Sequence, residues 1–197
     1  MDKSEIIAYM DQFQHLPNIN EDFSKIISML NTSDELSIDK LVDEISICPN
    51  LRKSLLTTIN SENFKMPRKA ETLKDSIMYL GLNTVKRLVL AYMIRSILPD
   101  NLGRSDEIDK DKYLKHCLGT SIAAIDIAEK LNIGEKYKYF AYGLIHDIGN
   151  AAIDICLPGI INEVTEIQSK GVNQIVAERE VMKGCTHCEI GSWICKK

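Results

Sequence analysis

Apolar residues recur along this chain at intervals of three and four positions, and no stretch alternates apolar and polar residues for long. This spacing places apolar side chains on one face of an α-helix, whereas sustained alternation would indicate a β-strand. The sequence therefore predicts an all-α fold, and it contains no internal repeat. The expected helices cover residues 1–14, 20–30, 38–46, 49–59, 72–80, 83–98, 111–131, 135–148, 158–167 and 172–183, with a last partial helix after Thr186.

A polar segment without periodicity, residues 100–110, separates the expected helices into two groups. Such segments usually run over the protein surface, so we expect an exposed connection between two helical lobes. Thr72 and Gly81 stand at the two ends of one short helix of the first group, as a helix N-cap and a left-handed C-cap would.

Composition and charge narrow the class of protein. A chain of 197 residues with 45% hydrophobic and 26% charged residues suits a soluble globular protein of one domain or two small lobes. Its net charge of −4 argues against DNA binding through bulk positive charge. Residues 1–10 lack the apolar core of a signal peptide, and polar residues interrupt the most apolar segment, 140–155. We therefore expect a cytoplasmic protein that does not enter a membrane, with its six cysteines reduced.

The segment GLIHDIG, residues 143–149, places His146 and Asp147 in an otherwise apolar run. Polar groups in such a setting need hydrogen bonds, a counter-charge or a metal to offset the loss of water. His116, on another expected helix, could join them, because helical bundles build internal metal sites from facing helices. Imidazole and carboxylate groups suit a divalent ion that could polarise a phosphate. The residues alone leave open both a structural hydrogen-bond network and a metal site.

The last thirteen residues contain Cys185, Cys188 and Cys195, with His187 between the first two. The spacing of the first pair occurs in structural zinc sites, but such a site normally uses two pairs. Because only one pair is present, we expect these cysteines to be ordinary small apolar residues of a helix. A zinc or redox site is the alternative.

Lys65, Arg68 and Lys69 form a basic group in the expected loop after the helix 49–59. Such a group could bind a phosphate-bearing ligand, such as a nucleotide, or an acidic partner. A solvated surface is the ordinary alternative.

GLIHDIG together with the upstream His116 resembles the HD superfamily of metal-dependent phosphohydrolases. Other segments, taken in order, are similar to one branch of it, the HD-related output domain (HDOD) of bacterial signalling proteins. The similar segments are LPNINEDFSKIISML (16–30), the run from Leu41 through Cys48-Pro49 to Ser61, MPRK (66–69), SIMYLGLNTVKRLVL (76–90) and AEREVMKG (177–184), followed by His187 and Gly191.

This resemblance implies a two-lobed multi-helix bundle. Residues 1–15 would form an N-terminal helix and residues 16–197 an HDOD domain, with an N-terminal lobe at 16–99 and an HD-like lobe at 111–197. The family normally completes its bundle with helices beyond the position of Lys197, so the second lobe is expected to be truncated. A bundle that lacks its closing helices exposes an apolar groove, which self-association or a partner helix would cover.

The chain departs from the family pattern at Cys48, where an Asp is usual, and at Thr186, where an acidic residue is common. No position matches the late Asp that completes the metal set of catalytic HD enzymes. The resemblance therefore implies a bacterial signal-transduction module that binds partner proteins without catalysis. The alternative is a metal-dependent phosphohydrolase acting on a nucleotide or a cyclic dinucleotide.

The resemblance and the residue types together give the candidate metal ligands, which are His116, His146, Asp147 and His187. The expected ion is Mn, Fe or Ni, with zinc at the cysteines as the alternative. The expected partners are signalling proteins and, if the basic group binds phosphate, a nucleotide.

Overall fold

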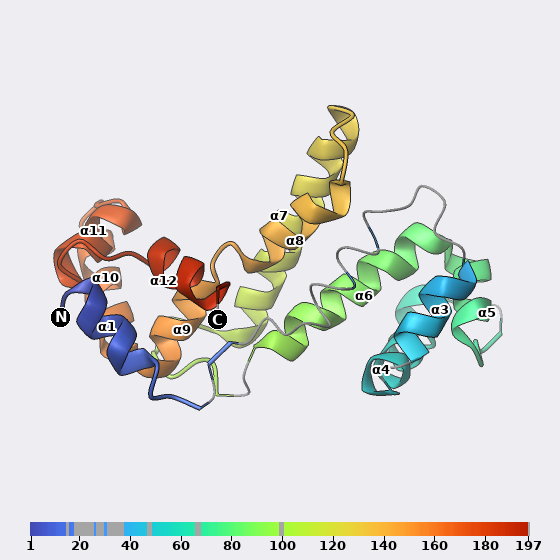
Figure 1. Ribbon diagram of the computed structural model, residues 1–197, viewed down its shortest axis with the longest axis horizontal. Coiled ribbons are helices and arrows are strands. Elements are labelled where there is room, and N and C mark those ends of the chain that lie inside the picture. The colour runs from blue at the N-terminus through green and yellow to red at the C-terminus, as the bar shows by residue number, and fades with distance from the viewer. Residues whose placement is uncertain are drawn as a thin grey trace.

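The computed structural model describes residues 1–14, 16–17, 26, 30, 38–46, 49–65, 68–98 and 101–196. Every regular element in these ranges is a helix, as the spacing of apolar residues predicts. Two groups of helices lie at opposite ends of an elongated molecule, and the helix α6 (Leu82–Ile97) runs between them (Figure 1). In the described part of the chain no single helix has the length and apolar character needed to cross a bilayer.

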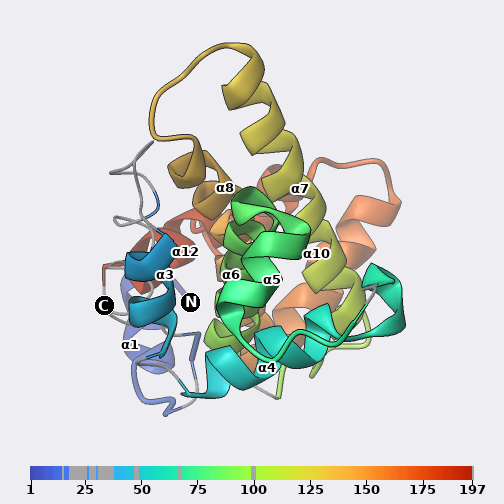
Figure 2. The same cartoon turned by 90° about the vertical axis from the view of Figure 1, so that its right-hand side faces the viewer.

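The N-terminal lobe consists of α3 (Ile38–Ser46), α4 (Pro49–Ile59), the short 3-10 helix η1 (Glu62–Phe64), α5 (Leu73–Leu80) and α6. Figure 2 views the molecule from this end. Thr72 caps α5 through a capping box with Asp75, and Gly81 follows the helix with a φ of 80°. Both positions confirm the predicted ends of this helix, but Gly81 has a ψ of 152° and so does not adopt the left-handed helical conformation that was expected there. The buried side chains of the lobe include Leu41, Ile45, Leu51, Leu55, Ile59, Leu73, Ile77, Val85, Val89 and Leu90.

The C-terminal lobe begins with a helical hairpin of α7 (Lys110–Lys130) and α8 (Lys136–Ile145), whose tip projects away from the body of the molecule (Figure 1). Four shorter helices complete the lobe. They are α9 (Ile148–Cys156), α10 (Pro158–Ser169), α11 (Gln174–Val181) and α12 (His187–Ile194).

The N-terminal helix α1 (Lys3–Met10) packs on the C-terminal lobe, beside α9 and α12 (Figures 1 and 2). The Lys3 ammonium lies 2.8 Å from the Glu189 carboxylate of α12, and Ile6 and Met10 are fully buried. The N-terminal helix α1 therefore packs with the C-terminal lobe, although the helices of the N-terminal lobe follow it in the sequence.

Two glycines of GLIHDIG let helices approach closely. A Cβ atom added to Gly143 would lie 2.6 Å from the Cα atom of Ser121 on α7. A Cβ atom added to Gly149 would lie 1.9 Å from the carbonyl oxygen of His187 at the start of α12. Contacts this short cannot be tolerated, so only glycine allows α8 to pack on α7 and α9 on α12 as they do.

Several predictions from the periodicity are wrong. The expected helix 135–148 ends early, because α8 stops at Ile145, and the following helix, which begins at Ile148, was not predicted at all. The first helix ends at Met10 instead of residue 14. The expected helix 20–30 and position Cys48 lie outside the described residues, except that Ile26 and Leu30 are helical and buried.

The predicted exposed connection at 100–110 is also partly wrong, because Asp154 of α9 anchors it. This carboxylate is fully buried and accepts backbone hydrogen bonds from Gly103, Arg104 and Ser105. The Arg104 guanidinium donates in turn to the carbonyl of Ile155. Buried charged groups need such partners, so the connection is fixed where it passes α9.

Candidate metal centre

The fold brings His116, His146 and Asp147 together from two places in the C-terminal lobe. His116 lies in α7, and the other two residues form the break between α8 and α9. The Nε2 atoms of the two histidines are 3.1 Å apart. The Oδ2 atom of Asp147 is 3.2 Å from His116 Nε2 and 3.1 Å from His146 Nε2. Three ligand atoms thus form a nearly equilateral triangle.

The partners of His146 define which of its nitrogens carries the proton. His146 Nδ1 lies 2.8 Å from the carbonyl oxygen of Gly143, which can only accept a hydrogen bond. In the neutral ring Nδ1 therefore carries the hydrogen, and Nε2 turns a lone pair toward the Asp147 carboxylate. A lone pair facing a carboxylate oxygen at 3.1 Å is repulsive unless a proton or a cation lies near both atoms.

The triangle fits a divalent metal ion. Neighbouring ligands around an ion with bonds of about 2.1 Å lie roughly 3 Å apart, close to the observed separations. In the described residues, His116, His146 and Asp147 form the one group of three or more ligand atoms that all lie within 4.8 Å of one another. The donor set of two imidazoles and one carboxylate suits Mn, Fe, Ni or Zn.

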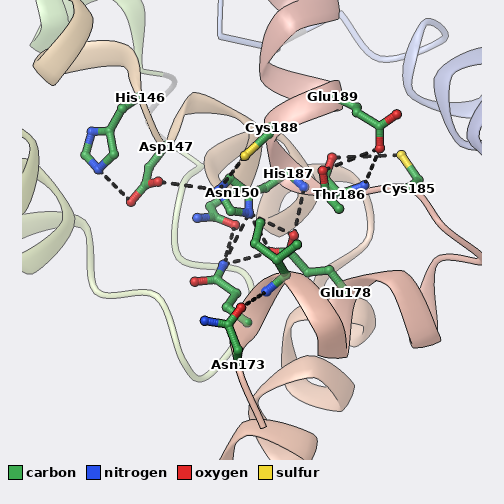
Figure 3. Close-up of polar contacts among 12 residues, drawn as sticks. His146, Asp147, Asn150, Asn173, Glu178, Cys185, Thr186, His187, Cys188 and Glu189 are labelled. Atoms are coloured by element: carbon green, nitrogen blue, oxygen red, sulfur yellow. Dashed lines mark hydrogen bonds and ion pairs between the residues drawn. The ribbon is translucent and has the colours of Figure 1, made fainter.

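His187 faces the same carboxylate from the other side (Figure 3). Its Nε2 atom lies 3.7 Å from Asp147 Oδ1, and its Nδ1 atom lies 2.7 Å from Glu178 Oε1. Because the Glu178 carboxylate accepts a hydrogen bond from Nδ1–H, the neutral His187 ring turns the lone pair of Nε2 toward Asp147. A carboxylate behind a histidine is the usual outer partner of a ligating imidazole. The fourth candidate ligand therefore stands next to the triangle without joining it.

A buried polar network fixes His187. Glu178 is 2% exposed and also accepts the backbone N–H of His187 at 3.0 Å. The Gln174 side chain donates to Glu178 at 2.7 Å and to Asn150 of α9 at 3.2 Å. These contacts join α9, α11 and α12 and hold the imidazole in one orientation.

The triangle is more open than its apolar sequence surroundings predict. The side chains of His116, His146 and Asp147 are 56%, 33% and 22% exposed. The expected burial is wrong, because His146 and Asp147 lie between two helices and their side chains meet the exposed His116 of α7. Solvent and a ligand can reach these three side chains.

The cysteines of the tail do not converge. Cys185 is buried, whereas Cys188 and Cys195 are exposed, and all three are free. The Cys188 sulfur lies 3.3 Å from His187 Nε2, so its nearest polar partner belongs to the His187 network. Burial raises the pKa of Cys188, as do the nearby carboxylates of Glu178 and Asp147, so this thiol is protonated at neutral pH.

The three residues of the basic group predicted from the sequence have different surroundings in the structure. The Arg68 guanidinium lies over the ring of Tyr79, 5.7 Å from its centroid. Lys65 is exposed in a left-handed conformation with a φ of 44°. Lys69 lines a hollow together with Arg52 and Lys53 of α4, which sequence reasoning missed.

Sequence reasoning also missed Glu178, Gln174 and Asn150. Glu178 precedes His187 by nine residues with a turn between them, so no helical spacing links the two. Its only sequence signal is its place in the segment AEREVMKG, which is similar to the HDOD pattern.

Because of the Glu178–His187 pair, we expect the free energy of unfolding to be highest at mildly acidic pH. It should decrease both at lower and at higher pH. Burial alone would raise the pKa of Glu178, but the hydrogen bonds from His187 lower it below its ordinary 4.5. Burial alone would lower the pKa of His187, but Glu178 raises it above 6.5. The Glu178 contribution is complete above pH 4.5 and is lost as pH falls through its folded pKa. The His187 contribution is complete below pH 6.5 and is lost as pH rises through its folded pKa.

Urea unfolding of chelator-treated protein across this pH range measures the effect. We expect wild type to lose about 2 kcal/mol across the two limbs, and Glu178→Gln to show a flatter profile. Parallel profiles of the two proteins would refute this role for the pair.

The sequence profile of the HDOD domain matches residues 16–197. The chain therefore belongs to the HDOD family, which confirms the resemblance and the all-α fold. No curated protein matches the chain.

Two solved structures share the fold. One is an HDOD domain protein of unknown function from Geobacter sulfurreducens, with a TM-score of 0.74 and 20% identity over 98% of this chain and 63% of that one. The other, from Shewanella amazonensis SB2B, is named as a candidate phosphohydrolase, with a TM-score of 0.68 and 19% identity over 97% of this chain and 65% of that one. The chain thus spans just under two thirds of the length of both proteins.

Proposed function

We propose that this chain is a regulatory module of a signalling system that acts by binding a partner protein, and that a divalent metal steadies its binding face. The observation that carries the proposal is an exposed apolar face on α7, which begins one turn after His116. In this function the module recognises its partner and catalyses no reaction.

The face consists of Gly119, Ile122, Ala123 and Ile127, all of them exposed. Ile122 is 44% exposed and Ile127 is 57% exposed. At 3.6 residues per turn these positions fall within an arc of about 140°, so they form one side of the helix. Large apolar side chains in a shared exposed arc usually mark an interaction site.

The position of the hairpin makes this face accessible. Both helices of the hairpin rise from the metal centre and project past the body of the molecule (Figure 1). Leu131 near the tip is 65% exposed and Tyr142 on α8 is 52% exposed, so a partner could extend its contact around the hairpin. Asp126 and Lys130 are exposed within the same arc, so the face combines apolar side chains with one acidic and one basic group.

The proposed metal links this face to the rest of the lobe. His116 would hold it from α7, and His146 and Asp147 from the break between α8 and α9. When bound, the ion supplies a positive charge that cross-links these three side chains. The exposed face of α7 would then be held at a fixed angle to α9.

The test identifies a partner protein, substitutes residues of the exposed α7 face and measures the change in affinity. A photoreactive residue at position 127 is expected to cross-link one defined partner, which is then purified and titrated with the chain. Ile122→Lys/Ile127→Lys should weaken that binding by at least roughly tenfold, because buried charges replace apolar contacts.

The matched control is Met78→Lys/Val176→Lys, which changes two large apolar side chains that are 70% and 54% exposed elsewhere. Its affinity should stay within roughly twofold of wild type. Equal affinities for both double variants, or no cross-linked protein at position 127, would rule out this face as the binding site.

A metal-dependent phosphohydrolase is the second candidate, and the open His116–His146–Asp147 triangle favours it. An ion held there could act as a Lewis acid on a phosphodiester, since solvent reaches the ligands. Hydrolysis of bis(p-nitrophenyl) phosphate with added Mn²⁺ separates the two functions. Turnover that is abolished in His146→Ala would favour the hydrolase, whereas equal background rates would favour the binding module.

A further inference from the structure

A hollow on the N-terminal lobe is lined by three basic side chains. It has a volume of about 920 Å³ and lies between α4 and the segment that leads into α5. Arg52 and Lys53 come from α4, and Lys69 comes from the segment. None of the residues that line the hollow belongs to the metal centre, whose candidate ligands lie on α7 and at the break between α8 and α9.

The three cations outnumber the acidic groups among the described residues of the lining. None of them forms an ion pair with any residue that the structure describes, although Lys74 on the same lobe lies 2.6 Å from Asp39. Glu71 contributes the one carboxylate among the lining residues that the structure describes, so these residues together carry an excess of two positive charges. A concave surface that concentrates charge of one sign attracts ligands of the other sign.

The wall that carries Lys69 is fixed in place. The Asn60 side-chain amide donates to the carbonyl of Ala70 at 2.9 Å, and its oxygen accepts the Ala70 N–H at 2.8 Å. Ala70 is 2% exposed, so this paired contact ties the segment to the end of α4. A preformed wall lowers the cost of ordering a site when a ligand binds.

We propose that this hollow binds a phosphorylated small molecule with two or more negative charges. Its volume lies in the range of small-molecule sites, and the Arg52 guanidinium offers the paired donors that match phosphate oxygens. Leu56 and Pro49 provide an apolar wall for the organic part of the ligand. The site would give the N-terminal lobe a small-molecule input that is independent of the metal centre.

Calorimetric titration of the whole chain with adenosine diphosphate, and separately with inorganic pyrophosphate, tests the proposal. A chelator removes any metal-dependent binding, and salt at about 0.15 M screens weak surface attraction. We expect saturable binding of the nucleotide at one site per chain. Arg52→Gln/Lys53→Gln/Lys69→Gln should weaken it at least roughly tenfold, because the charged hydrogen bonds to phosphate are lost.

The control is Arg179→Gln/Lys130→Gln/Lys196→Gln, which removes the same charges from exposed positions of the other lobe. Its affinity should stay within roughly twofold of wild type. Equal losses in both variants would assign the binding to bulk charge and overturn the proposal. The absence of saturable binding by either phosphate compound, or tighter binding of a glutamate-rich peptide than of the nucleotide, would also overturn it.

Discussion

Gly149→Ala is expected to lower the free energy of unfolding by about 3 kcal/mol, the largest loss we predict for a single methyl group in this chain. The added Cβ atom would lie 1.9 Å from the carbonyl oxygen of His187 and 2.9 Å from the backbone nitrogen of Gly191. Both are backbone atoms, which cannot rotate away, so α9 and α12 must separate. Urea unfolding followed by circular dichroism measures the loss.

Gly159→Ala is the matched control, because a Cβ atom there would meet nothing within 4 Å. Its stability should be unchanged or rise by up to about 0.5 kcal/mol, since alanine restricts the unfolded chain more than glycine does. Similar losses in the two variants would contradict the close approach of α9 and α12.

Asp154→Asn should also lower the free energy of unfolding by about 3 kcal/mol. One carboxylate oxygen accepts the N–H groups of Gly103 and Arg104 at 2.6 and 2.9 Å, and the other accepts the N–H of Ser105 at 2.8 Å. An amide nitrogen cannot accept a hydrogen bond, so the substitution leaves buried donors facing another donor. Urea unfolding measures the loss, and faster proteolysis at residues 101–108 would follow from release of the connection.

Asp106→Asn changes the same residue type in the same connection, at an exposed position. Its effect should stay within about 0.5 kcal/mol of wild type. If the two substitutions proved equally mild, Asp154 would not anchor the connection.

The helices could be predicted from the sequence wherever local signals decide them. Thr72 and Pro158 begin helices as their side chains indicate, and apolar spacing gives the extent of α3 and α4. The break at residues 146–147 could not be predicted, because no proline between residues 136 and 156 marks the end of a helix. Contacts with Ser121 and His187, which are distant in sequence, accompany the break.

The residues of the candidate site could likewise be predicted only in part. His116, His146 and Asp147 could be predicted from their residue types and from the HD resemblance, and the structure brings all three together. The Glu178 partner of His187 could not be predicted, because the turn between α11 and α12 creates the contact. The α4 side of the basic hollow was missed for a related reason. Arg52 and Lys53 occupy the exposed face of an amphipathic helix, where charged residues are ordinary.

The central claim is that His116, His146 and Asp147 hold one divalent metal ion. Elemental analysis of the purified protein tests this claim most directly. Wild type, His146→Ala and Cys188→Ser/Cys195→Ser are compared after gel filtration in metal-free buffer. We expect about one equivalent of Mn, Fe or Ni in wild type and in the cysteine variant, and its loss in His146→Ala. Wild-type protein without metal, or zinc that is lost only in the cysteine variant, would contradict the claim.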